Sequence, residues 1–307
     1  MKNFTALPAN VHVLERGWLS ANNIIFTGGP ATVMVDSGYC THAPQTLWLV
    51  ENILGQSSLD LLVNTHLHSD HCGGNAALQK RYPLLQTWIP PGEASAVTRW
   101  DVDALSYSAT GQHCPRFVFN RVMQAGTEID LGGVLWQIHA APGHDPHSVI
   151  FFEPKSGVLI SADTLWENGF GVVFPELEGD NAFGKVQATL NLIAQLEPKT
   201  VIPGHGPVFQ YSPEVMQRAQ RRLDAFTSNP KRHARHAAKV LIKFKLLDVQ
   251  RQTVDKFRQW AEQTPYFEQT RNRFFDDVSL TTWLEQLCGE LQIAGVASIE
   301  NGEISNR

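Results

Sequence analysis

Short hydrophobic runs alternate with turn-forming residues from residue 11 to about residue 210. The runs "NIIFTGG" and "ATVMVDSG" are typical of consecutive strands joined at Gly28-Gly29-Pro30. "LDLLVNTH" has the pattern of a buried strand that ends in polar residues, and further strands are expected in "VLWQIHAA", "HSVIFFEP", "GVLISAD" and "TVIPGH". Helical spacing occurs in "APQTLWLVENIL" and over residues 183–196. This order of elements predicts an α/β fold with sheets packed between helices.

The pattern changes after residue 210, where nearly all of the remaining sequence has helical character. Ser212, Pro213 and Glu214 are typical of the start of a helix. The final "GVASIENGEI" predicts a hairpin with Asn301-Gly302 at its turn, and this helix-then-hairpin ending resembles that of a winged-helix domain. We therefore expect two domains, residues 1–210 and a mostly helical extension over residues 211–307.

The composition limits the class of protein. A formal net charge of -5 gives no sign of a protein that binds polyanions along its whole surface. The N-terminal segment has a single Lys2 and no apolar core, and no run approaches 18 apolar residues, so neither a signal peptide nor a membrane span is expected. The four cysteines are widely spaced and form no CxxC pair, which favours a reducing, cytoplasmic setting.

Twelve histidines are many for 307 residues, and three of them fall in "NTHLHSDHCGGN". His66 and His68 are two positions apart, so they point to the same side of an extended segment. Asp70 and His71 follow where the chain turns into a predicted helix. Neutral imidazoles and a carboxylate are ligands for zinc, iron or manganese, so one loop offers four metal ligands.

Three more ligand types stand at the ends of later predicted strands. His144 lies in "APGHDPHS", Asp163 in "LISADTLW" and His205 in "VIPGHGPV". Strand ends are where α/β sheets hold their sites, so we expect these side chains to join the loop. Seven ligands exceed the needs of one tetrahedral ion but suit two ions that share one carboxylate.

Together "THLHSDH", "PGH", "SAD" and "PGHG" resemble the metallo-β-lactamase superfamily over about residues 11–210. The resemblance implies an αββα sandwich with a dinuclear site at one edge. It implies that His66, His68 and His144 hold the first ion, that Asp70, His71 and His205 hold the second, and that Asp163 bridges them. Zinc is the expected metal, with iron or manganese as alternatives. We expect Asp70 to orient the attacking water and to pass a proton to the leaving group.

Departures from known branches narrow the expected reaction. Asp163 stands where many antibiotic-cleaving members carry cysteine or serine, and His68 stands where the diiron, flavin-linked branch carries glutamate. The remaining similarity is to glyoxalase II-like, lactonase and phosphodiesterase branches, and "GHDPHS" resembles general hydrolases with C-terminal helical extensions. We expect hydrolysis of a small thioester, ester or lactone.

Two other functions stay open at this point. Residues 212–245 carry nine Lys or Arg against two Asp or Glu, which would suit a phosphodiesterase or nuclease that grips phosphates with its helices. A solvated helical face explains the same excess. The third hypothesis is a regulatory protein that binds metal without turnover. The helical extension could also cap the site or form a homodimer contact.

Five further residues carry reactive or titratable groups outside the ligand set. His147 is interpreted as a neighbour of the site, and Cys72 as a buried thiol that fills space. Asp36 lies near the end of "ATVMVDSG". The sequence favours neither of two hypotheses for it, a supporting role at the site or no role there. His113 and the adjacent Cys114 belong to a polar insertion for which two interpretations stay open, a loop that borders the pocket and a solvated loop.

Overall fold

The computed structural model describes residues 7–307, so Lys2, on which the expectation about a signal peptide rests, lies outside the described residues. Contacts divide the chain into two compact units: residues 1–101 with 114–223, and residues 102–113 with 224–307. The insertion around residue 107 therefore groups with the C-terminal part of the chain. Within the described residues no helix is both long enough and apolar enough to span a membrane.

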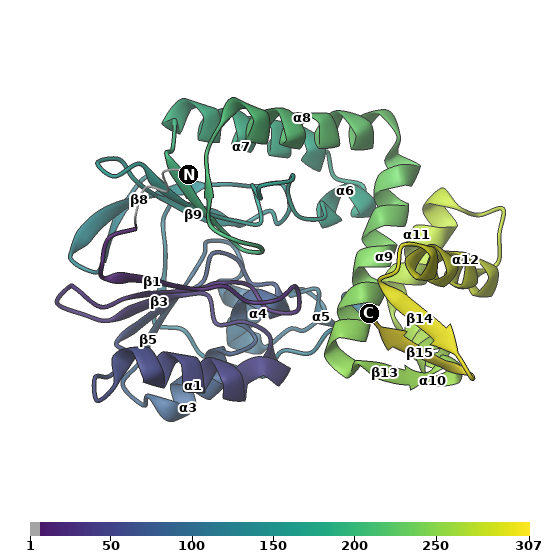
Figure 1. Cartoon of the computed structure of the whole chain (residues 1–307), viewed down its shortest axis with the longest axis horizontal. Helices are drawn as coiled ribbons and strands as arrows, with labels where there is room; N and C mark the ends of the chain where they lie inside the picture. Colours follow the sequence, from purple (N-terminus) through teal and green to yellow (C-terminus); the bar gives the residue numbers. More distant parts are fainter. Residues whose placement is uncertain (1–6) are drawn as a thin grey trace. The chain divides into compact units, whose positions relative to one another are not determined.

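The first unit contains two six-stranded mixed sheets (Figure 1). In the first sheet the three leading strands are antiparallel and the rest are parallel. In sheet order its strands are β1 (Val11–Leu14), β2 (Asn23–Phe26), β3 (Val33–Val35), β4 (Leu61–Val63), β5 (Gln86–Ile89) and β6 (Arg121–Val122). In chain order the second sheet has β7 (Glu128–Leu131), β8 (Val134–Ala140), β9 (Val149–Glu153), β10 (Val158–Ala162), β11 (Thr200–Pro203) and β12 (Phe209–Gln210).

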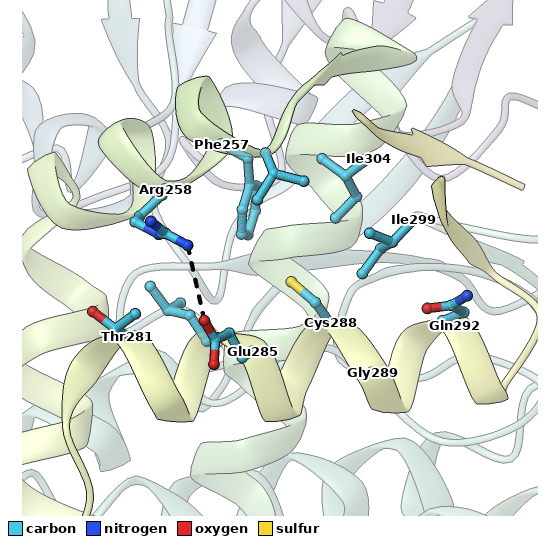
Figure 2. Close-up of a pocket in the computed structure, with 11 residues that line it drawn as sticks. Phe257, Arg258, Thr281, Glu285, Cys288, Gly289, Gln292, Ile299 and Ile304 are labelled. Carbon is cyan, nitrogen blue, oxygen red and sulfur yellow. Dashed lines mark ion pairs between the residues drawn. The ribbon is translucent and has the colours of Figure 1, made fainter. Parts of the chain in front are cut away.

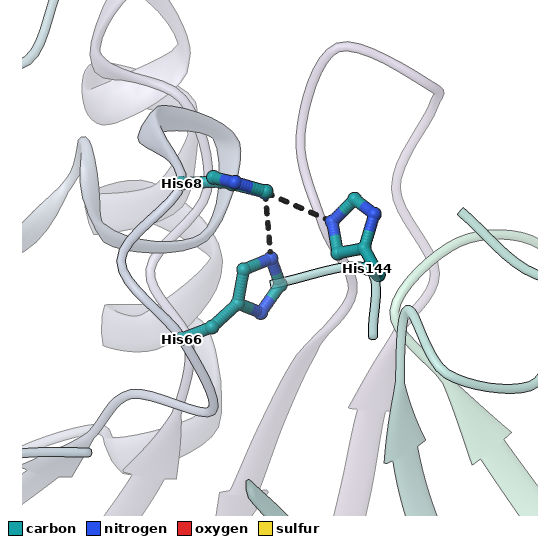
Figure 3. A group of neighbouring side chains, drawn as sticks. All are labelled: His66, His68 and His144. Atoms are coloured by element: carbon teal, nitrogen blue, oxygen red, sulfur yellow. Dashed lines mark hydrogen bonds between the residues drawn. The ribbon is translucent and has the colours of Figure 1, made fainter. Parts of the chain in front are cut away.

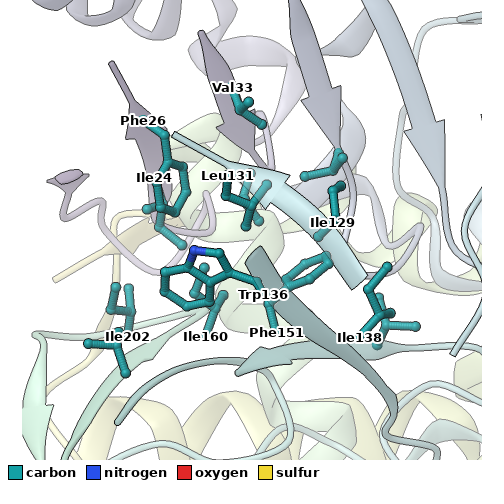
Figure 4. Packing of buried hydrophobic residues seen from close by; sticks show 14 of the residues in the cluster. Ile24, Phe26, Val33, Ile129, Leu131, Trp136, Ile138, Phe151, Ile160 and Ile202 are labelled. Carbon is teal, nitrogen blue, oxygen red and sulfur yellow. The ribbon is translucent and has the colours of Figure 1, made fainter. Parts of the chain in front are cut away.

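Alternation along the strands builds two cores. Ile24 and Phe26 face the second sheet, where they pack with Trp136, Phe151 and other buried residues (Figure 4). Ile25, between them, points to the opposite face and packs against residues of the helices there. Burying both faces of a sheet requires helices outside it, which confirms the predicted αββα layering.

The helices of this unit follow the predicted hydrophobic spacing. Those on the outer face of the first sheet contribute Val50, Leu54 and Leu78 to its outer core. The predicted helix over residues 183–196 is confirmed as α7. The bounds are η1 (Cys40–His42), α1 (Ala43–Leu54), α2 (Ser69–Cys72), α3 (Asn75–Arg81), α4 (Ala94–Arg99), α6 (Phe174–Glu178), α7 (Ala182–Leu196) and α8 (Pro213–Ser228), which runs on into the second unit.

The second unit is mostly helical and includes a three-stranded sheet in the order β13-β15-β14. Asn301 and Gly302 have φ values of 54° and 76°, as the predicted hairpin turn between β14 and β15 requires. The short strand β13 was not predicted. The elements are α5 (Tyr107–Thr110), α9 (Pro230–Val249), β13 (Arg251–Thr253), α10 (Val254–Gln263), α11 (Pro265–Phe274), α12 (Leu280–Ile293), β14 (Ala297–Glu300) and β15 (Glu303–Asn306).

Candidate metal centre

Strand direction brings the predicted ligands to one edge of each sheet. β8, β9 and β10 are antiparallel in turn and β11 is parallel to β10, so β8, β10 and β11 run the same way. His144, Asp163 and His205 each follow the C-terminal end of one of these strands. In the first sheet, His66 follows β4 in the same manner. The segment then enters the one-turn helix α2, which carries Asp70 and His71.

Three of the histidines form one group, shown in Figure 3. His66 Nε2 lies 3.1 Å from His68 Nδ1, which lies 2.8 Å from His144 Nε2. A four-coordinate zinc ion holds nitrogen ligands at about 2.0–2.1 Å, which places two such nitrogens roughly 3.3–3.4 Å apart. The two separations are about 0.2–0.6 Å shorter than this spacing, so the rings converge on one point and would open slightly around an ion.

The other four predicted ligands form a second group: Asp70, His71, Asp163 and His205. One potential ligand atom from each lies within 4.8 Å of those of the others. His205 Nε2 is 3.1 Å from Asp70 Oδ2, and His71 Nε2 is 3.4 Å from Asp163 Oδ1. The structure thus assembles all seven predicted residues into two neighbouring groups.

Asp163 lies between the two groups. Its Oδ2 is 3.5 Å from His144 Nε2 of the first group and 3.7 Å from His205 Nε2 of the second. The backbone before it is unusual, because Ala162 has a φ of 47° and the pairing of β10 with β11 shifts register there. A left-handed alanine is sterically unfavourable, so the surrounding structure must hold this carboxylate in place.

Burial and nearby carboxylates shift the pKa values of the histidines at the site. Burial lowers the pKa of His66 well below its usual value and that of His144 to about 4, so both rings are neutral at pH 7, as metal ligands must be. Burial also disfavours the charged form of His71, yet Asp36, Asp163 and Asp70 together raise its pKa well above the usual value. In the metal-free chain these carboxylates surround a position where positive charge is favourable.

The residues present fit divalent ions on two further observations. His71 Nε2 is buried and makes no hydrogen bond of good geometry within residues 7–307, although Asp163 Oδ1 of the second group lies 3.4 Å away at ion-pair distance. An orphaned buried nitrogen is costly unless something binds it. A Cβ atom on Gly204 would lie 2.1 Å from Asp163 Oδ1, so any side chain at residue 204 would clash with the Asp163 carboxylate. Imidazole and carboxylate donors suit zinc, iron and manganese alike.

Asp36 supports the second group. Its Oδ2 lies 2.8 Å from His71 Nδ1, and it accepts hydrogen bonds from the backbone N–H and the hydroxyl of Thr65. Asp36 follows β3, the parallel neighbour of β4, so it reaches the same sheet edge as His66. A carboxylate behind a histidine fixes which ring nitrogen faces the metal.

Asp36→Asn should therefore weaken metal binding by about 10- to 100-fold. The amide can still accept from Thr65, but it loses the charge that orients and polarises His71. Competition against a zinc-binding dye would measure the affinity. Asp60→Asn, which alters an exposed carboxylate bonded to Thr32, is the matched control. Unchanged affinity in Asp36→Asn would show that Asp36 serves only the local fold.

Other residues singled out in the sequence lie outside both groups. His147 donates its backbone N–H to Asp145, and its ring packs against Gly92, where a Cβ would fall 2.2 Å from Nδ1. The Sγ atoms of Cys72 and Cys114 lie 3.8 Å apart, both thiols are buried, and they form no disulfide. His113 is exposed.

Aromatic residues beside the ligands were not predicted. Trp18, 57% exposed, stacks on the ring of His205 with centroids 5.4 Å apart. Trp166 donates from Nε1 to Asp163 Oδ1 at 3.2 Å. Phe174 stands edge-on to His68. Trp166 follows Asp163 by three positions in "SADTLW", which is the only sequence signal that could have drawn attention to it.

The sequence and the fold are both similar to those of known proteins. The sequence is similar to a hydroxyacylglutathione hydrolase of Idiomarina loihiensis, with 26% identity over 188 aligned positions; the match covers 55% of this chain and 63% of the relative. A hydroxyacylglutathione hydrolase of Dechloromonas aromatica is 30% identical over 178 residues, which cover 58% of this chain and 54% of the relative. The chain thus spans less than two thirds of the length of these relatives.

Among solved structures, the metallo-beta-lactamase family protein TTHA1429 of Thermus thermophilus aligns over 98% of this chain and 100% of its own, with a TM-score of 0.58 and 16% identity. The TTHA1623 protein in a di-iron-bound form aligns over 65% of this chain and 94% of its own, with a TM-score of 0.52 and 26% identity. The sequence model described as "Metallo-beta-lactamase superfamily" matches residues 16–205. The chain therefore belongs to the metallo-beta-lactamase superfamily.

Proposed function

We propose that this chain is a metal-dependent hydrolase with two divalent ions, acting on a small thioester, ester or lactone. The observation that carries the proposal is the position of Asp163, within ion-pair distance of His144 in one ligand group and of His71 and His205 in the other. Hydrolysis is also what the names of the relatives from Idiomarina and Dechloromonas describe for those proteins.

The chain's own residues divide the work. His66, His68 and His144 would hold one ion, and Asp70, His71 and His205 the other, with Asp163 shared. When bound, the ions supply Lewis acidity and make hydroxide available at neutral pH. Asp70 keeps a side chain that is 15% exposed, whereas the side chain of Asp163 is 6% exposed. Asp70 is therefore the carboxylate that an incoming water can reach. It would accept a proton from the attacking water and deliver it to the leaving group.

Zinc is the ion that we propose, since its flexible geometry suits a site of three imidazoles beside a mixed histidine-carboxylate site. Iron is the first alternative, because the TTHA1623 structure, at 26% identity, holds two irons. Manganese accepts the same donors. Elemental analysis of protein purified without added metal decides among them.

The phosphodiesterase alternative is weakened by what the basic residues of the C-terminal helices contact. Arg235 and Lys239 both bind Glu290, and Lys243 donates to Asn306 and to two backbone carbonyls. Arg222 is half-buried and lies over the ring of Phe170, while Arg218 donates to a backbone carbonyl. Cations engaged in this way are poorly placed to grip a phosphate backbone.

The test is a panel of thioesters, lactones, aryl esters and bis-aryl phosphodiesters on protein of verified metal content. We expect turnover of at least one acyl substrate, and His68→Ala should abolish it and lower the metal content while the circular dichroism spectrum stays unchanged. A fully loaded protein that turns over none of the panel would favour a regulatory protein. Preference for the phosphodiesters would revive the nuclease hypothesis.

A further inference from the structure

The second unit has a cavity of about 340 Å³, open to solvent on one side, that plays no part in the proposed hydrolysis (Figure 2). It lies between α10, α12 and the hairpin of β14 and β15, and its volume falls in the range of small-molecule sites. Its apolar wall is formed by Val254, Phe257, Leu284, Cys288, Ile299 and Ile304.

One residue of the cavity wall, Gly289, is a glycine inside a helix. Gly289 lies inside the 14-residue helix α12, where glycine is less favourable than alanine. It has no positive φ, and a Cβ added there would meet no heavy atom within 4 Å. Neither backbone conformation nor close packing therefore requires glycine. What its absent side chain does provide is space along the cavity wall.

One cationic hydrogen-bond donor, Arg258, lies beside this apolar space. Arg258 lines the cavity and reaches Glu285 only at 3.8 Å, in an ion pair with side chains 42% and 65% exposed. Exposed pairs of this length are weak and easily exchanged. A ligand that supplies acceptor oxygens would give the Arg258 guanidinium closer partners than Glu285 does.

We propose that this cavity binds a small amphipathic carboxylate, with its apolar body against Phe257, Leu284 and Ile304 and its carboxylate on Arg258. A guanidinium binds a carboxylate through two parallel hydrogen bonds, which the distant Glu285 does not provide. Cys288 contributes apolar surface rather than a nucleophile, because burial and Glu285 raise the pKa of its thiol to about 12. The site stands independently of the proposed hydrolase activity, although that activity would release an acid of this class.

Octanoate is a suitable probe, titrated into the zinc-loaded full-length chain with methyl resonances of Ile299 and Ile304 observed by NMR. These methyl groups report on the cavity alone, so carboxylate binding at the metal centre would not be mistaken for it. We expect saturable shifts with octanoate and weaker ones with octylamine. Shifts absent from both resonances at millimolar octanoate would overturn the proposal without any variant.

Two variants test separately whether octanoate binding depends on the volume of the cavity and on the charge of Arg258. Gly289→Leu, which fills the cavity, should weaken octanoate binding by about tenfold or more, while Gln286→Leu on the exposed face of the same helix should leave it unchanged. Arg258→Gln should weaken octanoate by about tenfold but leave binding of 1-octanol nearly unchanged. Wild-type affinity in Gly289→Leu would place the ligand elsewhere, and equal losses of both probes in Arg258→Gln would refute carboxylate recognition. If sedimentation showed that Gly289→Leu dissociates a dimer, the cavity would be an interface between two copies instead.

Discussion

Asp163→Asn is expected to lower kcat by about a thousandfold or more and to reduce metal content from two ions per chain to one or fewer. Asp163 offers one oxygen toward His71 and the other toward both His144 and His205. Asparagine replaces one of these oxygens with an amide that only donates hydrogen bonds. It also removes a buried negative charge that two cations would share, so at least one ion loses its hold.

The measurement pairs turnover of the best substrate in the panel with elemental analysis of the same sample. Asp130→Asn, which changes an exposed carboxylate at the hairpin of β7 and β8, controls for the loss of a charge in the same unit. If Asp163→Asn kept two ions and turned over substrate at the wild-type rate, the shared-carboxylate arrangement would be wrong.

The sequence could predict the strand-end residues because their positions follow from a simple rule. A side chain just after a buried strand lies at a sheet edge, and strands of common direction bring such residues together, as with His144, Asp163 and His205. Asp36 obeys the same rule. Its role stayed undecided because the sequence does not show that β3 pairs with β4, and that pairing sets Asp36 beside His71.

What the sequence could not predict depends on contacts between distant segments. Trp18 lies in "ERGWLSANN", which has no periodic pattern, and only the folded chain brings its ring onto His205. For the insertion around Tyr107 the sequence left open a solvated loop or a loop that borders the pocket, whereas in the structure it forms α5 and packs with α11 of the second unit. The strand β13 has three residues, of which none is buried, so no hydrophobic signal marks it. It exists because β15 offers it a partner.

Gly204→Ala should have the second large effect, a loss of at least one metal ion together with about 1–3 kcal/mol of stability. The alanine Cβ would lie 2.1 Å from Asp163 Oδ1 and 3.0 Å from the ring of His71. The backbone cannot move away easily, because the Gly204 N–H donates to Ala162 and its carbonyl accepts from Asn22. One methyl group must therefore displace the carboxylate that the two ligand groups share.

Metal titration and denaturant unfolding of the metal-free chain measure the two effects separately. Gly17→Ala is the matched control, since a Cβ at Gly17 would meet no heavy atom within 4 Å and the residue has no positive φ. Loss of metal with unchanged stability of the metal-free chain would mean that Asp163 turns away freely when no ion holds it. Full metal occupancy in Gly204→Ala would contradict the geometry itself, because an intact dinuclear site cannot accommodate a methyl group where the Asp163 carboxylate lies.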